Sequence, residues 1–227
     1  MPDPDEEENK EDTGESKNHA HTLRDWGAII TNSDVIEMPE PNKVLLEVPG
    51  RSGRLDLSEV LTGDVTYSNR EIKLELAAQT NRDRWTETCL HIFNKFHGRV
   101  VHVTFDEDPG HYYVGRCSIT QPKRIASAGT MVVTIDAEPY RYEQEIYETT
   151  LTGGGSNLSG TVENLRMPAV PKVTVAGACQ LFAGGKVYEL AAGGNLDVPG
   201  LVFGPYENPV SVTGASSITF RFRRGCL

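Results

Sequence analysis

Strict alternation of apolar and polar residues is the feature that most constrains how this chain can fold. In REIKLEL, residues 70–76, the apolar residues Ile72, Leu74 and Leu76 are separated by charged ones. Successive side chains of a strand point to opposite faces, so this segment predicts a strand with one buried and one solvated face. The same alternation returns in TMVVTIDA, residues 130–137. Both segments indicate an antiparallel sheet.

One helix is predicted within this strand-rich region. Residues 81–98, NRDRWTETCLHIFNKFHG, carry apolar side chains at the offsets of an amphipathic helix. Asn81 can cap its start, and Gly98 can take the left-handed position at its end. Further along, the turn DEDPG, residues 106–110, joins RVVHVTF to HYYVGRCSI and predicts a β-hairpin.

Composition divides the chain into four parts. The first 18 residues hold eight acids and two lysines and almost no apolar side chain, which predicts a disordered acidic tail over residues 1–21. The stretch TGGGSNLSGT predicts a flexible linker over residues 151–161. About seven short strand candidates follow it without a helical stripe. The sequence therefore predicts a mainly β protein, with a first domain over residues 22–150 that holds one α-helix and a small β-sandwich over residues 162–227.

The net charge of -10 limits the partners. Affinity for nucleic acid comes mainly from Lys and Arg at phosphates, so general nucleic-acid binding is disfavoured, whereas an acidic surface suits DNA that must slide past. No apolar run is long enough to span a membrane, and no secretory signal pattern is seen, which predicts a cytoplasmic protein. The cysteines are widely spaced and predict reduced thiols rather than a zinc site or disulfides: Cys89, Cys117, Cys179 and Cys226.

The motifs that could carry chemistry are better explained as structure. PGRSG, residues 49–53, lacks the Lys-Ser/Thr ending of a phosphate loop and precedes no helix, which favours a β-turn. The acids of DEDPG are too close together for a calcium loop, and the histidines form no HExxH pattern. The arginines of SITFRFRR, residues 217–224, are interpreted as protecting an exposed strand edge rather than binding nucleic acid. We expect no catalytic site, metal or cofactor.

Five elements, in order, resemble the distal tail proteins of long-tailed siphophages. They are VPGRSGRLDLSEVLTG, VTYSNREIKLEL, an amphipathic helix ending in FHG, VTFDEDPGHYYVGR, and a strand running into AEPYRYE. This match covers about residues 23–145. The second domain resembles the galectin-like β-sandwich of that family in size, in position and in the segment NLRMPAVPKVTV at its start.

The resemblance implies a fold and a role. The first domain would be a tail-tube-like β-barrel or sandwich, and six copies would form a hub ring at the tail tip of a phage or prophage. The ring would join the tail-tube protein to the tail-associated protein and to receptor-binding or baseplate proteins, leaving a lumen that DNA crosses without specific binding. Such a protein is assembled in the bacterial cytoplasm and is neither an enzyme nor a membrane protein.

The resemblance also singles out structural residues. It implies a structural corner at PGRSG and either buried or intersubunit pairing for two arginines. The candidate structural and assembly residues are Pro49, Gly50, Arg51, Gly53, Arg70, Gly98, Gly115 and Arg116. No catalytic residue follows from it.

Two other functions stay open at this point. A carbohydrate-binding adhesion module would use the second domain to contact a host wall, with the first domain as a scaffold. A tail-tube protein would share the fold of the first domain, although the additional β-sandwich favours the tail tip. A cell-wall hydrolase ranks last, because no nucleophile or acid-base pair is recognisable.

Overall fold

The computed structural model describes residues 20–32, 35–60, 62–79, 82–120, 122–125, 128–153 and 157–227. Most of the predicted acidic tail over residues 1–21 lies outside the described residues, as does the predicted cap Asn81. The described chain is mainly β, as the alternation predicts. Its contacts form two compact units, the first from described residues within 1–35, 73–97 and 119–134, and the second from those within 36–72, 98–118 and 135–227.

The first unit is a piece of sheet with two helices. It contains α1 (Thr22–Trp26), β1 (Ile29–Ile30), α2 (Arg82–Phe96), β7 (Lys123–Ile125), and most of β4 (Arg70–Gln79) and β8 (Ala128–Ala137). Strand β4 lies between β1 and β8, and β7 pairs with β8. Every second residue of β4 and β8 is buried, which confirms the predicted alternation: Leu74, Leu76, Ala78, Met131 and Val133.

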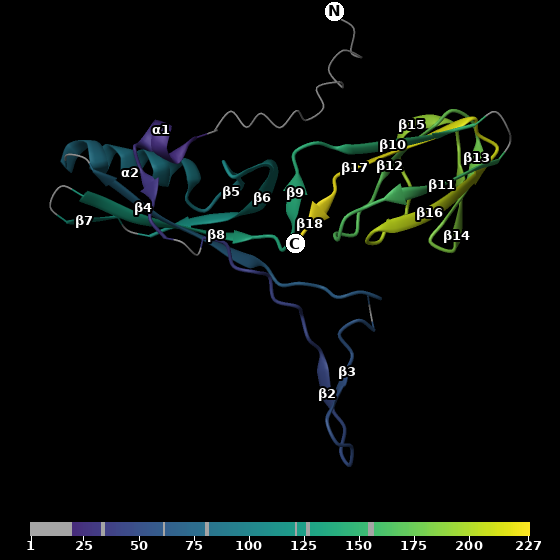
Figure 1. The fold of residues 1–227 in the computed structure, drawn as a ribbon, viewed down its shortest axis with the longest axis horizontal. Helices are drawn as coiled ribbons and strands as arrows, with labels where there is room; N and C mark the ends of the chain where they lie inside the picture. The colour runs from purple at the N-terminus through teal and green to yellow at the C-terminus, as the bar shows by residue number, and fades with distance from the viewer. Residues whose placement is uncertain are drawn as a thin grey trace, which may run out of the picture. The chain divides into compact units, whose positions relative to one another are not determined.

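Helix α2 occupies the predicted position and lies over β4 in Figure 1. The predicted apolar stripe consists of Trp85, Cys89, Ile92, Phe93 and Phe96. Trp85, Cys89 and Ile92 are buried, whereas Phe96 is half-buried and Phe93 is 39% exposed. Gly129 of β8 makes room for Trp85, because a Cβ atom at this glycine would lie 2.3 Å from the indole ring. Gly98 has a φ of +74°, the left-handed conformation expected just beyond a helix end.

The structure adds a short helix, α1, to the one helix that the sequence predicts. The imidazole Nδ1 of His21 accepts a hydrogen bond from the backbone N–H of Arg24, so a histidine side chain caps the first turn. Gly27 ends the helix with a φ of +63°. Trp26 then meets Phe96 of α2 edge to face, with ring centroids 5.6 Å apart.

The second unit contains several strands outside the two sheets of the β-sandwich. These are β2 (Leu45–Glu47), β3 (Arg54–Asp56), β5 (Val100–Phe105), most of β6 (Asp108–Ile119), β9 (Arg141–Glu143) and β18 (Gly225–Cys226). Strand β6 pairs with β5, β8 and β9, and β9 pairs with β18. The two-residue turn between β5 and β6 confirms the predicted hairpin.

Two four-stranded sheets complete the second unit. One has the order β10-β17-β12-β15 and the other the order β11-β16-β13-β14. Their bounds are β10 (Tyr147–Thr152), β11 (Asn157–Glu163), β12 (Lys172–Val175), β13 (Cys179–Ala183), β14 (Lys186–Leu190), β15 (Gly193–Asp197), β16 (Glu207–Thr213) and β17 (Ser217–Phe222). Alternate residues of both sheets meet in one apolar core around Leu181, Val212, Ile218 and Phe220, which confirms the β-sandwich (Figure 1).

Two details of this sandwich differ from the sequence-based predictions. Much of the predicted linker over residues 151–161 is strand, because β10 and β11 extend into it from both sides and gain ladder hydrogen bonds with β17 and β16. The interpretation of SITFRFRR as an exposed edge is wrong. Strand β17 lies between β10 and β12, so both of its edges are paired. Phe220 and Phe222 bury its inner face in the core.

Candidate functional site

The PGRSG motif forms the tip of a hairpin. Strands β2 and β3 pair antiparallel, with Leu46 opposite Leu55 and Glu47 opposite Arg54. The tip turns through Gly50 and Gly53, whose φ values of +83° and +82° are costly for any residue with a Cβ atom. These glycines therefore permit the turn.

Exposed apolar side chains cover this hairpin. Val44, Leu45, Leu46 and Val48 are each between 38% and 57% exposed. In the described part of the chain, β2 and β3 pair only with each other. A two-stranded ribbon is marginally stable by itself, and a concentrated apolar surface of this kind is typical of an interaction site.

Arg70, at the start of β4, is a buried charge. Its guanidinium lies 5.3 Å above the ring of Tyr113, and its Nη2 atom donates a hydrogen bond to the carbonyl of Pro139. Burial lowers the pKa of Arg70, the expected effect of removing a cation from water. Only 3% of Arg70 is exposed, so its contacts are within the chain.

Three other candidate residues meet where β5 begins and β6 ends. Arg116 donates from Nη1 to the carbonyl of Gly98 at 2.6 Å, and the N–H of Gly98 donates to the carbonyl of Cys117 at 2.7 Å. Gly115 lies against the backbone of β8, where an added Cβ would be 2.6 Å from the Cα of Ala137. These contacts join the start of β5 to the end of β6 and bring β6 close to β8.

Sequence reasoning missed an ion pair between segments 102 residues apart. Arg166 donates two hydrogen bonds to the carboxylate of Asp64, at 2.5 and 2.9 Å. These hydrogen bonds lower the pKa of Asp64 and raise that of Arg166. The pair fastens the loop after β3 to the segment between β11 and β12. The only sequence signal near it is the segment NLRMPAVPKVTV, which contains Arg166.

The C-terminal arginines of β17 and its continuation are engaged within the chain. Arg224 forms a two-pronged ion pair with Glu143 at 2.8 and 3.0 Å and stacks 4.1 Å above the ring of Tyr147. Arg223 donates to the carbonyls of Glu143 and Gln144. These contacts tie the end of the chain to β9 and engage the guanidinium groups of Arg223 and Arg224.

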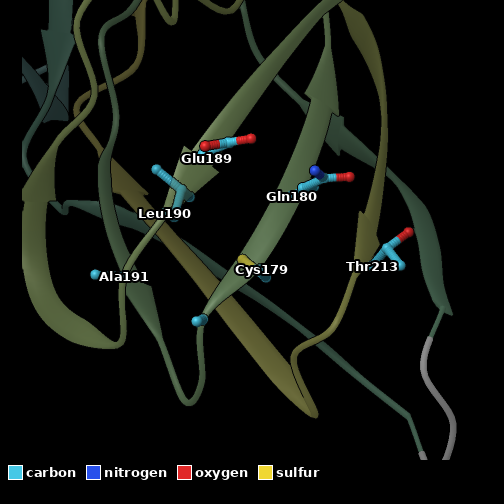
Figure 2. Close-up of a pocket in the computed structure, with 7 residues that line it drawn as sticks. Cys179, Gln180, Glu189, Leu190, Ala191 and Thr213 are labelled. Atoms are coloured by element: carbon cyan, nitrogen blue, oxygen red, sulfur yellow. The ribbon is translucent and has the colours of Figure 1, made fainter.

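An open hollow of about 510 Å³ lies at the end of the β13–β14 sheet. Figure 2 shows its lining, which consists of Ala178, Cys179, Gln180, Glu189, Leu190, Ala191 and Thr213. Glu189 is the one carboxylate of this lining, and burial raises the pKa of the Cys179 thiol. A protonated thiol is a poor nucleophile.

The described residues contain neither a metal-ligand group nor a membrane-spanning helix. Among them, no three His, Cys, Asp or Glu side chains are grouped as metal ligands. None of the helices in the described ranges is long and apolar enough to cross a membrane.

The fold can be compared with known proteins. In sequence, the chain matches no family model and no curated protein. In structure, it is similar to the Dit (gp 19.1) protein of phage SPP1, whose crystal structure is described as a paradigm of the hub adsorption apparatus in phages that infect Gram-positive bacteria. The TM-score is 0.64 at 14% sequence identity, over 90% of this chain and 96% of that one. The fold of this chain thus resembles that of a phage tail hub protein through both of its β-rich parts.

Proposed function

We propose that this chain is a structural protein of a phage or prophage tail, placed at the distal tip of the tail. The observation that carries the proposal is the structural similarity to a hub adsorption protein, which extends over nine-tenths of the chain. A similarity limited to one β-sandwich would be weak support, because that architecture serves many functions.

In the proposed assembly, six copies form a closed ring. The exposed apolar hairpin around Leu46 supports a contact with a neighbouring copy, because its apolar side chains need a cover that the described chain does not supply. Head-to-tail contacts of this type close into a ring when the rotation between copies is suitable. The PGRSG tip would then be part of the contact between subunits.

The ring would join the tail-tube protein on one face to the tail-associated protein on the other. The galectin-like sandwich would carry receptor-binding or baseplate proteins, and assembly would take place in the host cytoplasm. DNA would cross the lumen unbound, since a net charge of -10 disfavours lasting contact with phosphates. In this role the protein has no catalytic function.

Native mass spectrometry with negative-stain imaging tests the ring. We expect a sixfold particle with a central hole and about six times the 24.9 kDa mass of one chain. Leu46→Glu should give monomers, whereas Val187→Glu, at a similarly exposed position on β14, should leave the ring intact. A ring that survives Leu46→Glu would exclude the hairpin contact, and a wild-type monomer at every concentration would contradict a self-assembling ring.

A further inference from the structure

Tyr206 combines an unfavourable backbone conformation with an exposed side chain. Its φ is +66°, in the left-handed region that glycine and asparagine tolerate and bulky residues avoid. The conformation is held by the backbone, since the N–H of Tyr206 donates to the carbonyl of Leu165 and its carbonyl accepts from the N–H of Asn164. The aromatic residue is nevertheless 67% exposed. Glycine would serve this turn better, so folding does not explain the tyrosine ring.

Two exposed valines belong to the adjacent segments 164–170 and 202–206, the second of which ends in Tyr206. Ala169 and Phe203 are both buried and exchange two backbone hydrogen bonds, at 2.9 and 2.8 Å. In an antiparallel pairing the next residues point to the opposite side, and Val170 and Val202 are accordingly 64% and 50% exposed. We call Val170, Val202 and Tyr206 the Tyr206 surface.

Two glutamates beside Tyr206 carry negative charge that the chain does not neutralise. Glu163 of β11 and Glu207 of β16 are directly opposite each other, and both are exposed. Like charges in this position destabilise a sheet. Within the described residues neither glutamate has an ion-pair partner, and the nearby Arg166 is occupied by Asp64. A cation from another molecule would therefore be favoured here.

We propose that the Tyr206 surface, together with Glu163 and Glu207, docks a protein segment that carries Lys or Arg next to apolar side chains. The carboxylates would pair with the cation, the tyrosine ring would pack on it or beside it, and the valines would cover the apolar neighbours. Tyrosine is frequent among the residues that dominate protein interfaces, because it buries a large area with little loss of entropy. The inference rests on the attachment role proposed above and specifies the chemistry of the attached partner.

Selection from a random peptide library against the full-length protein tests this surface. We expect the selected peptides to be enriched in Lys or Arg beside aromatic or aliphatic residues. Their affinity should fall at least about tenfold for Tyr206→Gly and for the double variant Glu163→Lys/Glu207→Lys. Phe182→Ser, which removes an exposed aromatic side chain from β13 of the same sandwich, should leave the affinity unchanged. Peptides without basic residues, or equal binding to all variants, would overturn the proposal.

The melting temperature separates recognition from folding. Because glycine relieves the left-handed conformation but makes the unfolded chain more flexible, Tyr206→Gly should leave Tm unchanged or raise it by up to about 3 °C. A larger fall in Tm would show that the ring supports the fold and would refute the argument. Native mass measured on the same samples reports the ring independently, so lost peptide binding and lost ring assembly are distinguishable.

Discussion

Substitution of Gly115 by alanine gives a quantitative test of the packing between β6 and β8. The added Cβ would lie 2.6 Å from both the Cα of Ala137 and the carbonyl oxygen of Asp136, and 2.7 Å from a methyl group of Ile135. Carbon atoms in contact are normally about 3.5 to 4.0 Å apart, so the two strands would have to separate by roughly 1 Å. Two of the three opposing atoms belong to the backbone, which cannot turn away as a flexible side chain does.

The expected cost follows from this overlap. Overpacking costs about 1–3 kcal/mol, and we expect a value near 3 kcal/mol because backbone atoms must move. For a chain of this size that loss lowers Tm by roughly 6–12 °C.

Circular dichroism melts of the wild type, Gly115→Ala and Gly110→Ala measure the effect. Gly110 is the matched control, because it lies in the same strand and a Cβ there would meet no atom within 4 Å. Gly110→Ala should change Tm by no more than a few degrees, about 1 kcal/mol in either direction. Equal Tm values for the two variants would refute the close approach of β6 and β8 at Gly115.

Three further predictions concern other contacts. Gly129→Ala would drive a methyl group into the Trp85 ring and should lower Tm by several degrees in thermal melts, whereas an unchanged Tm would contradict the seating of α2. Asp64→Asn should cost about 1–2 kcal/mol at pH 7, measured by urea unfolding. Arg166 lowers the pKa of Asp64 in the folded protein, so the cost of Asp64→Asn is present above pH 3.8, the pKa of Asp64 in the unfolded chain. The cost should vanish as the pH falls through the lower pKa of the folded state. A stability difference between wild type and variant that persists at still lower pH would contradict the pairing. Burial raises the pKa of Cys89 and Cys117 to about 11, so a thiol reagent at pH 8 should label the partly exposed Cys226 first, which peptide mapping would check.

Local patterns predicted the elements that depend on local physics. The alternation in β4 and β8 and the helical spacing of α2 indicate which side chains must leave water, and the structure buries those side chains. The hairpin of β5 and β6 follows from a turn of Asp, Pro and Gly residues. Hydrophobic periodicity is sufficient for such elements because each residue's face is set by its neighbours a few positions away.

The arginines after Phe220 show where local patterns are insufficient. Alternation identifies the buried face of β17, but the same pattern fits an edge strand and a central one, since the position depends on partners from β10 and β12. The strained backbone of Tyr206 could not be predicted from the sequence either, because its φ value results from a turn that hydrogen bonds to a distant segment hold in place.

By itself, the sequence determined that this is a mainly β protein with an amphipathic helix, a strongly acidic start and a second group of short strands. When the chain folds, its alternating apolar side chains must leave water, and strands with one buried face achieve this. Only the tertiary structure decided which surfaces remain uncovered and which charges are paired. The Asp64–Arg166 pair and the opposed Glu163 and Glu207 depend on contacts between segments far apart in the chain, and the energies of such contacts are set by distance in space. The hairpin around Leu46 is exposed because, among the described residues, no distant strand pairs with it.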